Sequence, residues 1–166
     1  GVRLNLRTSE DVEREARELA VTLKGLAPDA HVEGFLVQEM VNGPELLLGA
    51  RTDPLYGPVL VLSAGGTLVE LHGDKALRLM PVDKDCAIAM LNELRITKSF
   101  GGYRNMPRRD VDAIINSICG LSDLFMDLRH IASDIEINPL IVLPEGQGVR
   151  AVDVRVIFRE PPQSMS

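Results

Sequence analysis

The sequence lacks the features that mark several large classes of protein. It has no hydrophobic run long enough to span a bilayer, and its start shows no signal-peptide pattern. Positive charge is in deficit, because 18 Lys and Arg residues face 24 Asp and Glu residues and the net charge is −6. This balance argues against nucleic acid or an anionic membrane surface as a partner. We therefore expect a cytoplasmic protein that binds neither.

Cysteine and histidine are also scarce. The two cysteines, Cys86 and Cys119, lie far apart in helix-like stretches, which favours reduced, buried thiols over a disulfide. Neither cysteine has a histidine close by in the sequence that would suggest a nucleophile. The histidines His31, His72 and His130 show no spacing typical of metal ligands. Each is most simply read as a surface or core residue.

Composition and periodicity indicate one globular domain. The chain has 166 residues, of which 45% are hydrophobic and 25% are charged. Polar N-caps followed by apolar residues at helical spacing predict helices over residues 8–25, 83–94 and 110–129. Strands are predicted over residues 34–40, 45–51, 59–63, 68–71, 134–143 and 149–157, with another ending near 78–81 and a hairpin turn at Asn42-Gly43. This pattern predicts an α+β fold, an antiparallel sheet with helices on one side.

Polar side chains alternate along the strand candidate that ends in Leu140. Side chains alternate faces along a strand, so Asp134, Glu136 and Asn138 share one face. If the following hairpin turns on Glu145-Gly146, Asn138 lies directly opposite Asp153. Carboxylate and amide oxygens arranged in this way suit Mg²⁺ held together with substrate phosphates. The alternative is the ordinary solvated face of a two-layer sheet.

Other segments are weaker candidates for ligand contacts. Backbone groups at the strand end Gln38–Val41 could pair with a planar base, but an ordinary hairpin is the preferred explanation from these residues alone. Glu45 enters an apolar strand and needs a partner, either a ribose hydroxyl, an Arg or solvent. Gly65-Gly66 is a small-residue loop that admits phosphate to backbone N–H groups, or is a plain turn. Arg78 balances phosphate charge or pairs with Glu70.

Taken in order, these segments resemble a known family. The chain resembles the ATP-grasp, nucleotide-binding part of the NDP-forming acyl-CoA synthetases, such as ADP-forming acetyl-CoA synthetase, and more distantly the β subunit of succinyl-CoA synthetase. The resemblance runs from the first residue to about Phe158. The stretches that carry it are Gly34–Val41, Glu45 with Leu48-Gly49, Asp53–Val59, Gly65-Gly66 with Val69-Glu70, Arg78–Pro81, Gly102–Arg104, and Glu136–Leu140 with Ala151–Asp153.

The resemblance implies a role for each candidate residue. It implies ATP or ADP and Mg²⁺ as cofactors, with Glu136, Asn138 and Asp153 at the metal. The implied nucleotide contacts are Gln38, Glu39, Met40 and Val41 at adenine, Glu45 at the ribose, Gly65 and Gly66 at the phosphates, and Arg78 as a catalytic group facing the phosphates. The family interconverts acyl-CoA, NDP and phosphate with a carboxylic acid, CoA and NTP through an acyl phosphate and a phosphohistidine.

Departures from the family pattern set limits on this reading. The glycine-rich segment with a Lys and a His, the small ATP-grasp subdomain, and the CoA-binding and ligase domains are not in these 166 residues. Ser63-Ala64 stands where the family usually has Gly-Leu. We therefore expect residues 1–158 to form the nucleotide-binding part, 159–166 a linker or tail, and the chain to be inactive alone.

The expected partners are the CoA-binding and ligase domains, or an α subunit, of the same synthetase. Two alternatives remain open at this point. One is another ATP-grasp carboxylate ligase, and the other is a regulatory synthetase-like domain fused to a protein lysine acetyltransferase.

Overall fold

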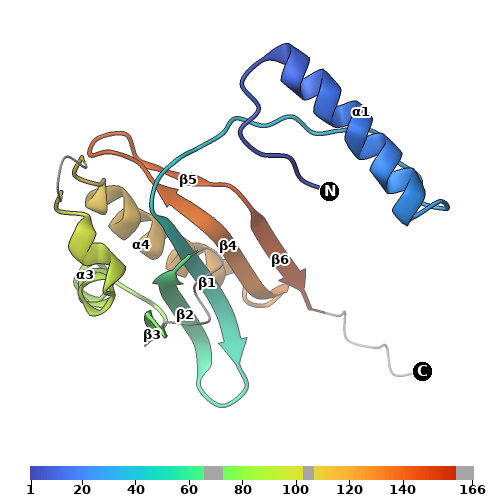
Figure 1. Cartoon of the computed structure of the whole chain (residues 1–166). Helices are drawn as coiled ribbons and strands as arrows, with labels where there is room; N and C mark the ends of the chain where they lie inside the picture. Colours follow the sequence, from blue (N-terminus) through green and yellow to red (C-terminus); the bar gives the residue numbers. More distant parts are fainter. Residues whose placement is uncertain (66–72, 103–106, 160–166) are drawn as a thin grey trace, which may run out of the picture. The chain divides into compact units, whose positions relative to one another are not determined.

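The computed structural model describes residues 1–65, 73–102 and 107–159 of the chain. These residues form two compact units, Gly1–Val41 and Asn42–Ser166, which are described separately (Figure 1). The strand predicted at 68–71 and residues 160–166 of the predicted tail lie outside the described residues.

The first unit contains helix α1, Ser9–Leu26. Its N-cap is Thr8, whose hydroxyl oxygen accepts a hydrogen bond from the backbone N–H of Asp11 at 3.1 Å, as the sequence predicts. The prediction of a strand over 34–40, with a hairpin at Asn42-Gly43, was wrong: residues 31–40 are all exposed and form no strand. A strand is stable only when a neighbouring strand satisfies its backbone groups, and the described part of this unit holds no other strand.

The described residues of the second unit form one antiparallel sheet of six strands, ordered β3-β2-β1-β4-β5, with β6 also paired to β4 (Figure 1). Every pairing is antiparallel, which confirms the predicted fold class. The strands are β1 Glu45–Asp53, β2 Gly57–Ala64, β3 Lys75–Leu79, β4 Ala132–Val142, β5 Val149–Ala151 and β6 Val154–Phe158. The strand β4 is central, because β1 pairs with one edge and β5 and β6 with the other.

The last predicted strand is interrupted. The sequence predicts a single strand over 149–157, whereas the structure has β5 and β6 with Val152 and Asp153 between them. The interruption faces Pro139 of β4, which has no backbone N–H to donate across the ladder. Two hydrogen bonds keep the register across the gap, from Asn138 N to Asp153 O at 3.0 Å and from Val152 N to Pro139 O at 3.1 Å.

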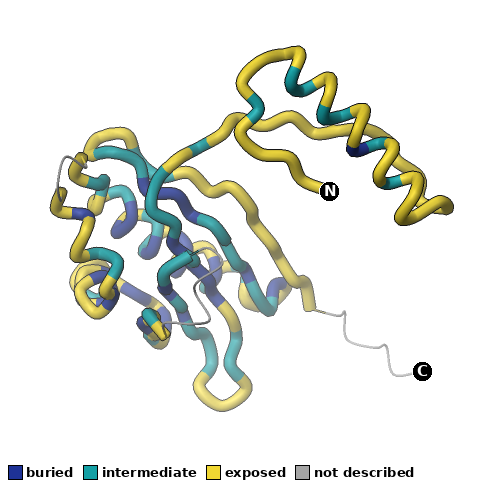
Figure 2. Tube along the Cα trace, viewed as in Figure 1, coloured by how far each residue is buried: buried dark blue, intermediate teal, exposed yellow. Residues whose placement is uncertain are grey.

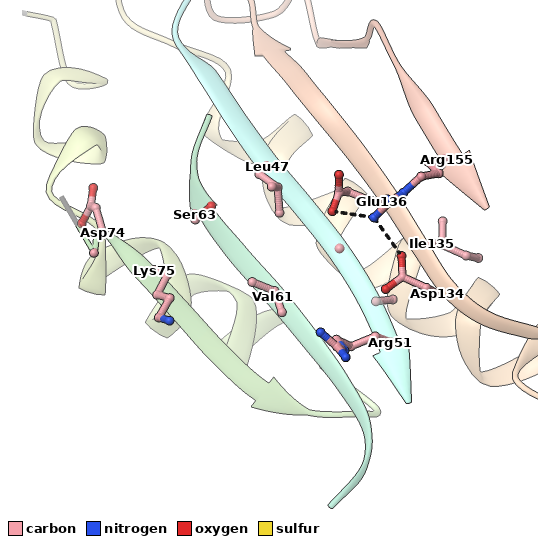
Figure 3. Close-up of a pocket in the computed structure, with 13 residues that line it drawn as sticks. Leu47, Arg51, Val61, Ser63, Asp74, Lys75, Asp134, Ile135, Glu136 and Arg155 are labelled. Carbon is pink, nitrogen blue, oxygen red and sulfur yellow. Dashed lines mark hydrogen bonds and ion pairs between the residues drawn. The ribbon is translucent and has the colours of Figure 1, made fainter. Parts of the chain in front are cut away.

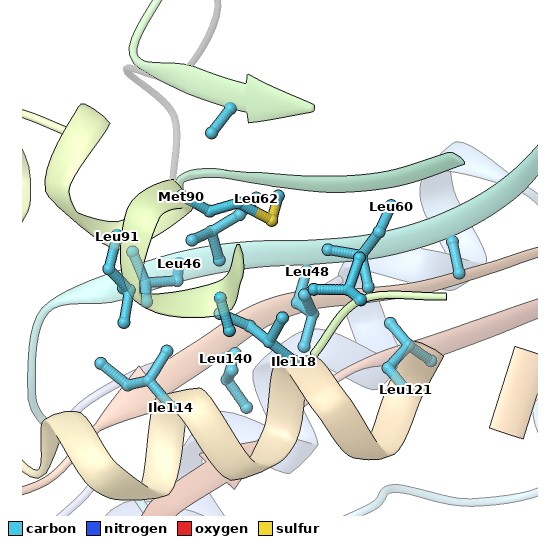
Figure 4. Close-up of a cluster of buried hydrophobic side chains, with 14 of the residues drawn as sticks. Leu46, Leu48, Leu60, Leu62, Met90, Leu91, Ile114, Ile118, Leu121 and Leu140 are labelled. Atoms are coloured by element: carbon cyan, nitrogen blue, oxygen red, sulfur yellow. The ribbon is translucent and has the colours of Figure 1, made fainter. Parts of the chain in front are cut away.

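Helices cover one face of this sheet. They are α3, Lys84–Glu93, capped by Asp83, and α4, Val111–Leu128, capped by Asp110, joined through a short 3-10 helix, Ile96–Ser99. Both α-helices begin and end within two residues of their predicted bounds. Buried side chains lie between sheet and helices (Figures 2 and 4), among them Leu46, Leu48, Leu60, Leu62, Ile114, Ile118 and Leu140.

The two cysteines are half-buried, whereas the sequence favoured buried thiols. Cys86 and Cys119 are both free thiols, and burial raises the pKa of the Cys119 thiol. Among the described residues, no helix combines the length and the apolar character that crossing a bilayer requires.

Candidate functional site

The face of the sheet opposite α3 and α4 carries a hollow of about 280 Å³ (Figure 3). Alternation along each strand decides which side chains point there: Leu48 and Leu60 face the helices, so Leu47, Arg51 and Val61 face the hollow. Strand β1 contributes Gly49 to its centre, and the missing side chain leaves space beside β4. We call this surface the open face; its charged members are Arg51, Asp74, Lys75, Asp134, Glu136 and Arg155.

Two carboxylates of β4 and one guanidinium of β6 meet at the centre of the open face. Arg155 lies opposite Glu136 in the β4–β6 pairing. Its Nη2 lies 3.4 Å from Glu136 Oε2 and 3.8 Å from Asp134 Oδ1, so one nitrogen atom is shared by both acids (Figure 3). The acids come from alternate positions of one strand, as the sequence predicts, and we call them the acid pair.

One oxygen of the acid pair is unsatisfied. Asp134 Oδ1 is buried and accepts no hydrogen bond from the described residues. Its ion pair with Arg155, at 3.8 Å, is too long to be a hydrogen bond. A buried carboxylate oxygen without a donor is costly, and a cation is the natural partner for it. Mg²⁺ usually needs only one or two protein carboxylates beside water and phosphate oxygens, so the acid pair fits this ion.

Asn138 and Asp153 lie next to the acid pair along the same two strands. Their backbones are hydrogen-bonded to each other across the β5–β6 interruption, as the hairpin register predicts. Among the described residues, neither side chain forms a hydrogen bond, and no three His, Cys, Asp or Glu side chains converge as a metal-binding group. The hollow is lined by Glu136 but not by Asn138 or Asp153. Their role as metal ligands stays a prediction.

Arg78 lies on the other side of the sheet. In the β2–β3 pairing it is opposite the buried Leu60, while Lys75, an odd number of residues away, lines the hollow. The Arg78 guanidinium forms an ion pair with Glu93 of α3, and that contact lowers the pKa of the Glu93 carboxyl. The structure therefore gives Arg78 a partner other than the predicted Glu70, which lies outside the described residues.

The remaining predicted nucleotide contacts are placed as follows. Glu45 begins β1, and its carbonyl oxygen accepts a hydrogen bond from Gly65 N at 2.7 Å. A Cβ on Gly65 would lie 2.8 Å from the Glu45 carbonyl carbon, so glycine is required there by backbone packing alone. Gly66 lies outside the described residues, as do Tyr103 and Arg104. The residues Gln38, Glu39, Met40 and Val41 belong to the first unit.

Three basic residues of the open face escaped the sequence analysis: Arg51, Lys75 and Arg155. The position of Arg155 could have been predicted, because the register that sets Asn138 opposite Asp153 also sets Glu136 opposite Arg155. Arg51 is opposite Asp134 in the β1–β4 pairing. That pairing joins strands more than eighty residues apart, and no local pattern predicts its register.

The fold and the chemistry of the open face can be compared with those of known proteins. The model of the family described as "ATP-grasp domain" matches residues 1–158, and the chain belongs to this family. This confirms the resemblance inferred from the sequence motifs.

Within the family, the chain is similar to ADP-forming ligases. It is 28% identical to the β subunit of acetate–CoA ligase (ADP-forming) II of Pyrococcus furiosus, over 95% of this chain and 67% of that subunit. It is 33% identical to acetate–CoA ligase (ADP-forming) I of Archaeoglobus fulgidus, over 96% of this chain and 23% of that protein. The chain thus spans about two thirds of the first relative and a quarter of the second.

A solved structure shares the fold over nearly the whole chain. The dinucleotide-forming acetyl-coenzyme A synthetase 1 of Ca. Korarchaeum cryptofilum, in complex with coenzyme A and Ca-AMPCP, has a TM-score of 0.82 at 33% identity, over 96% of this chain and 69% of that one. The same enzyme in complex with coenzyme A and Mg-AMPPCP, its phosphohistidine segment pointing towards the nucleotide-binding site, has a TM-score of 0.79 at 31% identity, over 96% and 68%.

Proposed function

We propose that this chain binds Mg²⁺ with ATP or ADP on the open face of its sheet, as one domain of an NDP-forming acyl-CoA synthetase. The observation that carries the proposal is the acid pair, in which Asp134 Oδ1 is buried without a hydrogen bond among the described residues. A divalent cation would satisfy that oxygen. The similarity to ADP-forming ligases, and to a synthetase solved with Mg-AMPPCP, supports a nucleotide as the second ligand.

Residues at the junction of β4, β5 and β6 would hold the cation. The acid pair, Asp134 and Glu136, would supply carboxylate oxygens. Asn138 and Asp153, which follow along the same paired backbone, are retained as the further ligands that the resemblance implies. Bound there, Mg²⁺ would neutralise phosphate charge and orient the terminal phosphoryl group for in-line transfer. Strand β4, paired along both edges, would carry Asp134, Glu136 and Asn138, and Asp153 would be held by its backbone hydrogen bond to Asn138.

Other residues would contact the rest of the nucleotide. Arg51 and Lys75 line the open face and form no ion pair with another described residue, and both would face phosphate oxygens. We retain Glu45 as the ribose contact and Gly65 and Gly66 at the phosphates. We also retain Gln38, Glu39, Met40 and Val41 as the adenine hinge, acting through backbone groups.

The reaction that we propose for the whole protein interconverts acyl-CoA, NDP and phosphate with a carboxylic acid, CoA and NTP through a phosphohistidine. Because the chain spans only part of its relatives, CoA binding and the histidine would come from partner domains or an α subunit. The chain alone would bind nucleotide without completing the reaction.

Calorimetric titration of ADP into the intact protein, with MgCl₂ or with EDTA, tests the proposal. We expect tighter binding with Mg²⁺, and we expect the double variant Asn138→Ala/Asp153→Ala to lose that Mg²⁺-dependent gain. A matched control is Asn116→Ala/Asp127→Ala, which removes the same residue types from exposed positions on α4, on the covered side of the sheet. Unchanged Mg²⁺-dependent affinity in the first double variant would remove the metal assignment.

A further inference from the structure

Arg155 occupies the place between the two carboxylates that a cation would take. A single atom, Arg155 Nη2, is the nearest positive group to both Asp134 Oδ1 and Glu136 Oε2 (Figure 3). Two carboxylates on one strand face repel each other, and a shared positive charge offsets that repulsion. The guanidinium thus offsets the repulsion between the two carboxylates of the acid pair.

The contact between Arg155 and the acid pair is loose. The separations of 3.4 and 3.8 Å exceed the 2.7–2.9 Å that is typical of a good charge-assisted hydrogen bond. The Arg155 side chain is 61% exposed, so water competes for its donors. A Mg²⁺ ion binds carboxylate oxygens at about 2.0–2.1 Å and carries twice the charge. A divalent ion would therefore displace the guanidinium at little cost.

A displaced Arg155 would remain at the site. Its backbone is held in β6 opposite Glu136, so the side chain would stay beside the cation. The planar guanidinium presents five donors in a fork that matches phosphate oxygens. Once displaced from the acid pair, the Arg155 guanidinium would be able to bind the phosphates of the nucleotide that accompanies the metal.

We propose that Arg155 is a positioning residue that holds Asp134 and Glu136 together until a divalent cation replaces it, and that it then turns to the phosphates of the bound nucleotide. This inference rests on the proposed Mg²⁺ and nucleotide site. It predicts that removing the Arg155 guanidinium raises the affinity for the metal alone and lowers the affinity for the metal in the presence of nucleotide. A purely structural role would move both affinities in the same direction or leave both unchanged.

The experiment measures binding of Mn²⁺ to the intact protein by electron paramagnetic resonance, with and without ADP. We expect Arg155→Gln to bind Mn²⁺ about three- to ten-fold more tightly in the absence of ADP, because a competing charge is removed. We expect the same variant to bind Mn²⁺ with ADP about ten-fold more weakly, because a charge-assisted phosphate contact is lost. Arg155→Lys, which keeps the charge, should stay close to wild type without ADP.

The control is Arg150→Gln, an exposed arginine on β5 whose guanidinium bonds only to the carbonyl of Val149 among the described residues. It should leave both affinities unchanged, and a thermal melt should show that each variant folds. If Mn²⁺ binds wild type and Glu136→Gln abolishes that binding while Arg155→Gln does not tighten it, the inference about Arg155 is wrong and the metal site stands. If no protein binds Mn²⁺ even with ADP, the proposed function itself fails.

Discussion

The backbone N–H of Asn138 donates to the carbonyl oxygen of Asp153 at 3.0 Å. The same register places Arg155 opposite Glu136 and Val154 opposite Ile137. One hairpin alignment therefore assembles the predicted metal ligands and the guanidinium that bridges the acid pair. A slip of one residue would turn one strand's site residues to the covered face, so the turn at Glu145-Gly146 matters for the site as much as the side chains do.

Gly65 packs against the backbone of β1 so closely that no side chain fits there. This structural role can be measured as stability, without nucleotide. Gly65→Ala should lower the free energy of unfolding by about 1–3 kcal/mol, because the new Cβ would press on backbone atoms of Glu45 and Leu46 that cannot retreat. The matched control is Gly120→Ala within α4, where nothing lies within 4 Å of the new Cβ. That variant should gain about 0.5–1 kcal/mol. Urea denaturation of both variants measures the difference, and equal stability would contradict the packing argument.

The Asp110 carboxylate links the start of α4 to the β4–β5 turn through hydrogen bonds. These contacts should make the stability of the protein depend on pH. Its Oδ2 accepts from Gly148 N at 2.8 Å and its Oδ1 from Ala113 N at 3.0 Å. These two donors, Gly148 first, hold the pKa of the Asp110 carboxyl below its usual value. A lowered pKa gives stability that is present above the unfolded-state pKa and is lost as the pH falls through the folded-state value.

We therefore expect Asp110→Ala to cost about 1 kcal/mol or more near pH 7, as the loss of a helix cap typically does. The cost should begin to shrink as the pH falls below about 4, where Asp110 of the unfolded chain becomes protonated. It should be lost once the pH falls through the lowered pKa of the folded state. Thermal melts of both proteins between pH 7 and pH 3 measure it, with Asp127→Ala on the exposed side of α4 as the control. A cost that stays constant over this range would show that the carboxylate charge plays no part.

Arg78 has two competing explanations, and its ion-pair partner distinguishes them. If the contact with Glu93 is its main role, Arg78→Ala and Glu93→Gln should each change stability by less than about 1 kcal/mol, as exposed ion pairs do. Both variants should then bind ADP and ATP as wild type does. If Arg78→Ala lost more affinity for ATP than for adenosine, and Glu93→Gln lost neither, Arg78 would contact the phosphates as the family resemblance implies. Parallel calorimetric titrations with ATP and adenosine decide between the two.

Much of the second unit was predictable because its elements are specified locally. Asp83 and Asp110 precede apolar residues at helical spacing, and both cap the helices that they were expected to cap. The alternation of Asp134, Glu136 and Asn138 predicted one polar face on β4, where all three residues are half-buried. The prediction over 34–40 failed because the apolar run Phe35-Leu36-Val37 indicates only a capacity to pair. A strand also needs a neighbour, which the described part of the first unit lacks.

The sequence by itself determined the class of fold, the helix caps, the polar ladder and the hairpin register that sets Asn138 opposite Asp153, since all of these depend on residues close together in the chain. Only the tertiary structure decided which basic groups share the open face. The pairing of β1 with β4 brings Arg51 to Asp134, and the pairing of β3 with β2 turns Arg78 towards α3 and Lys75 towards the hollow. These registers depend on contacts between distant segments, whose alignment is selected by burial of the shared core and not by any local pattern.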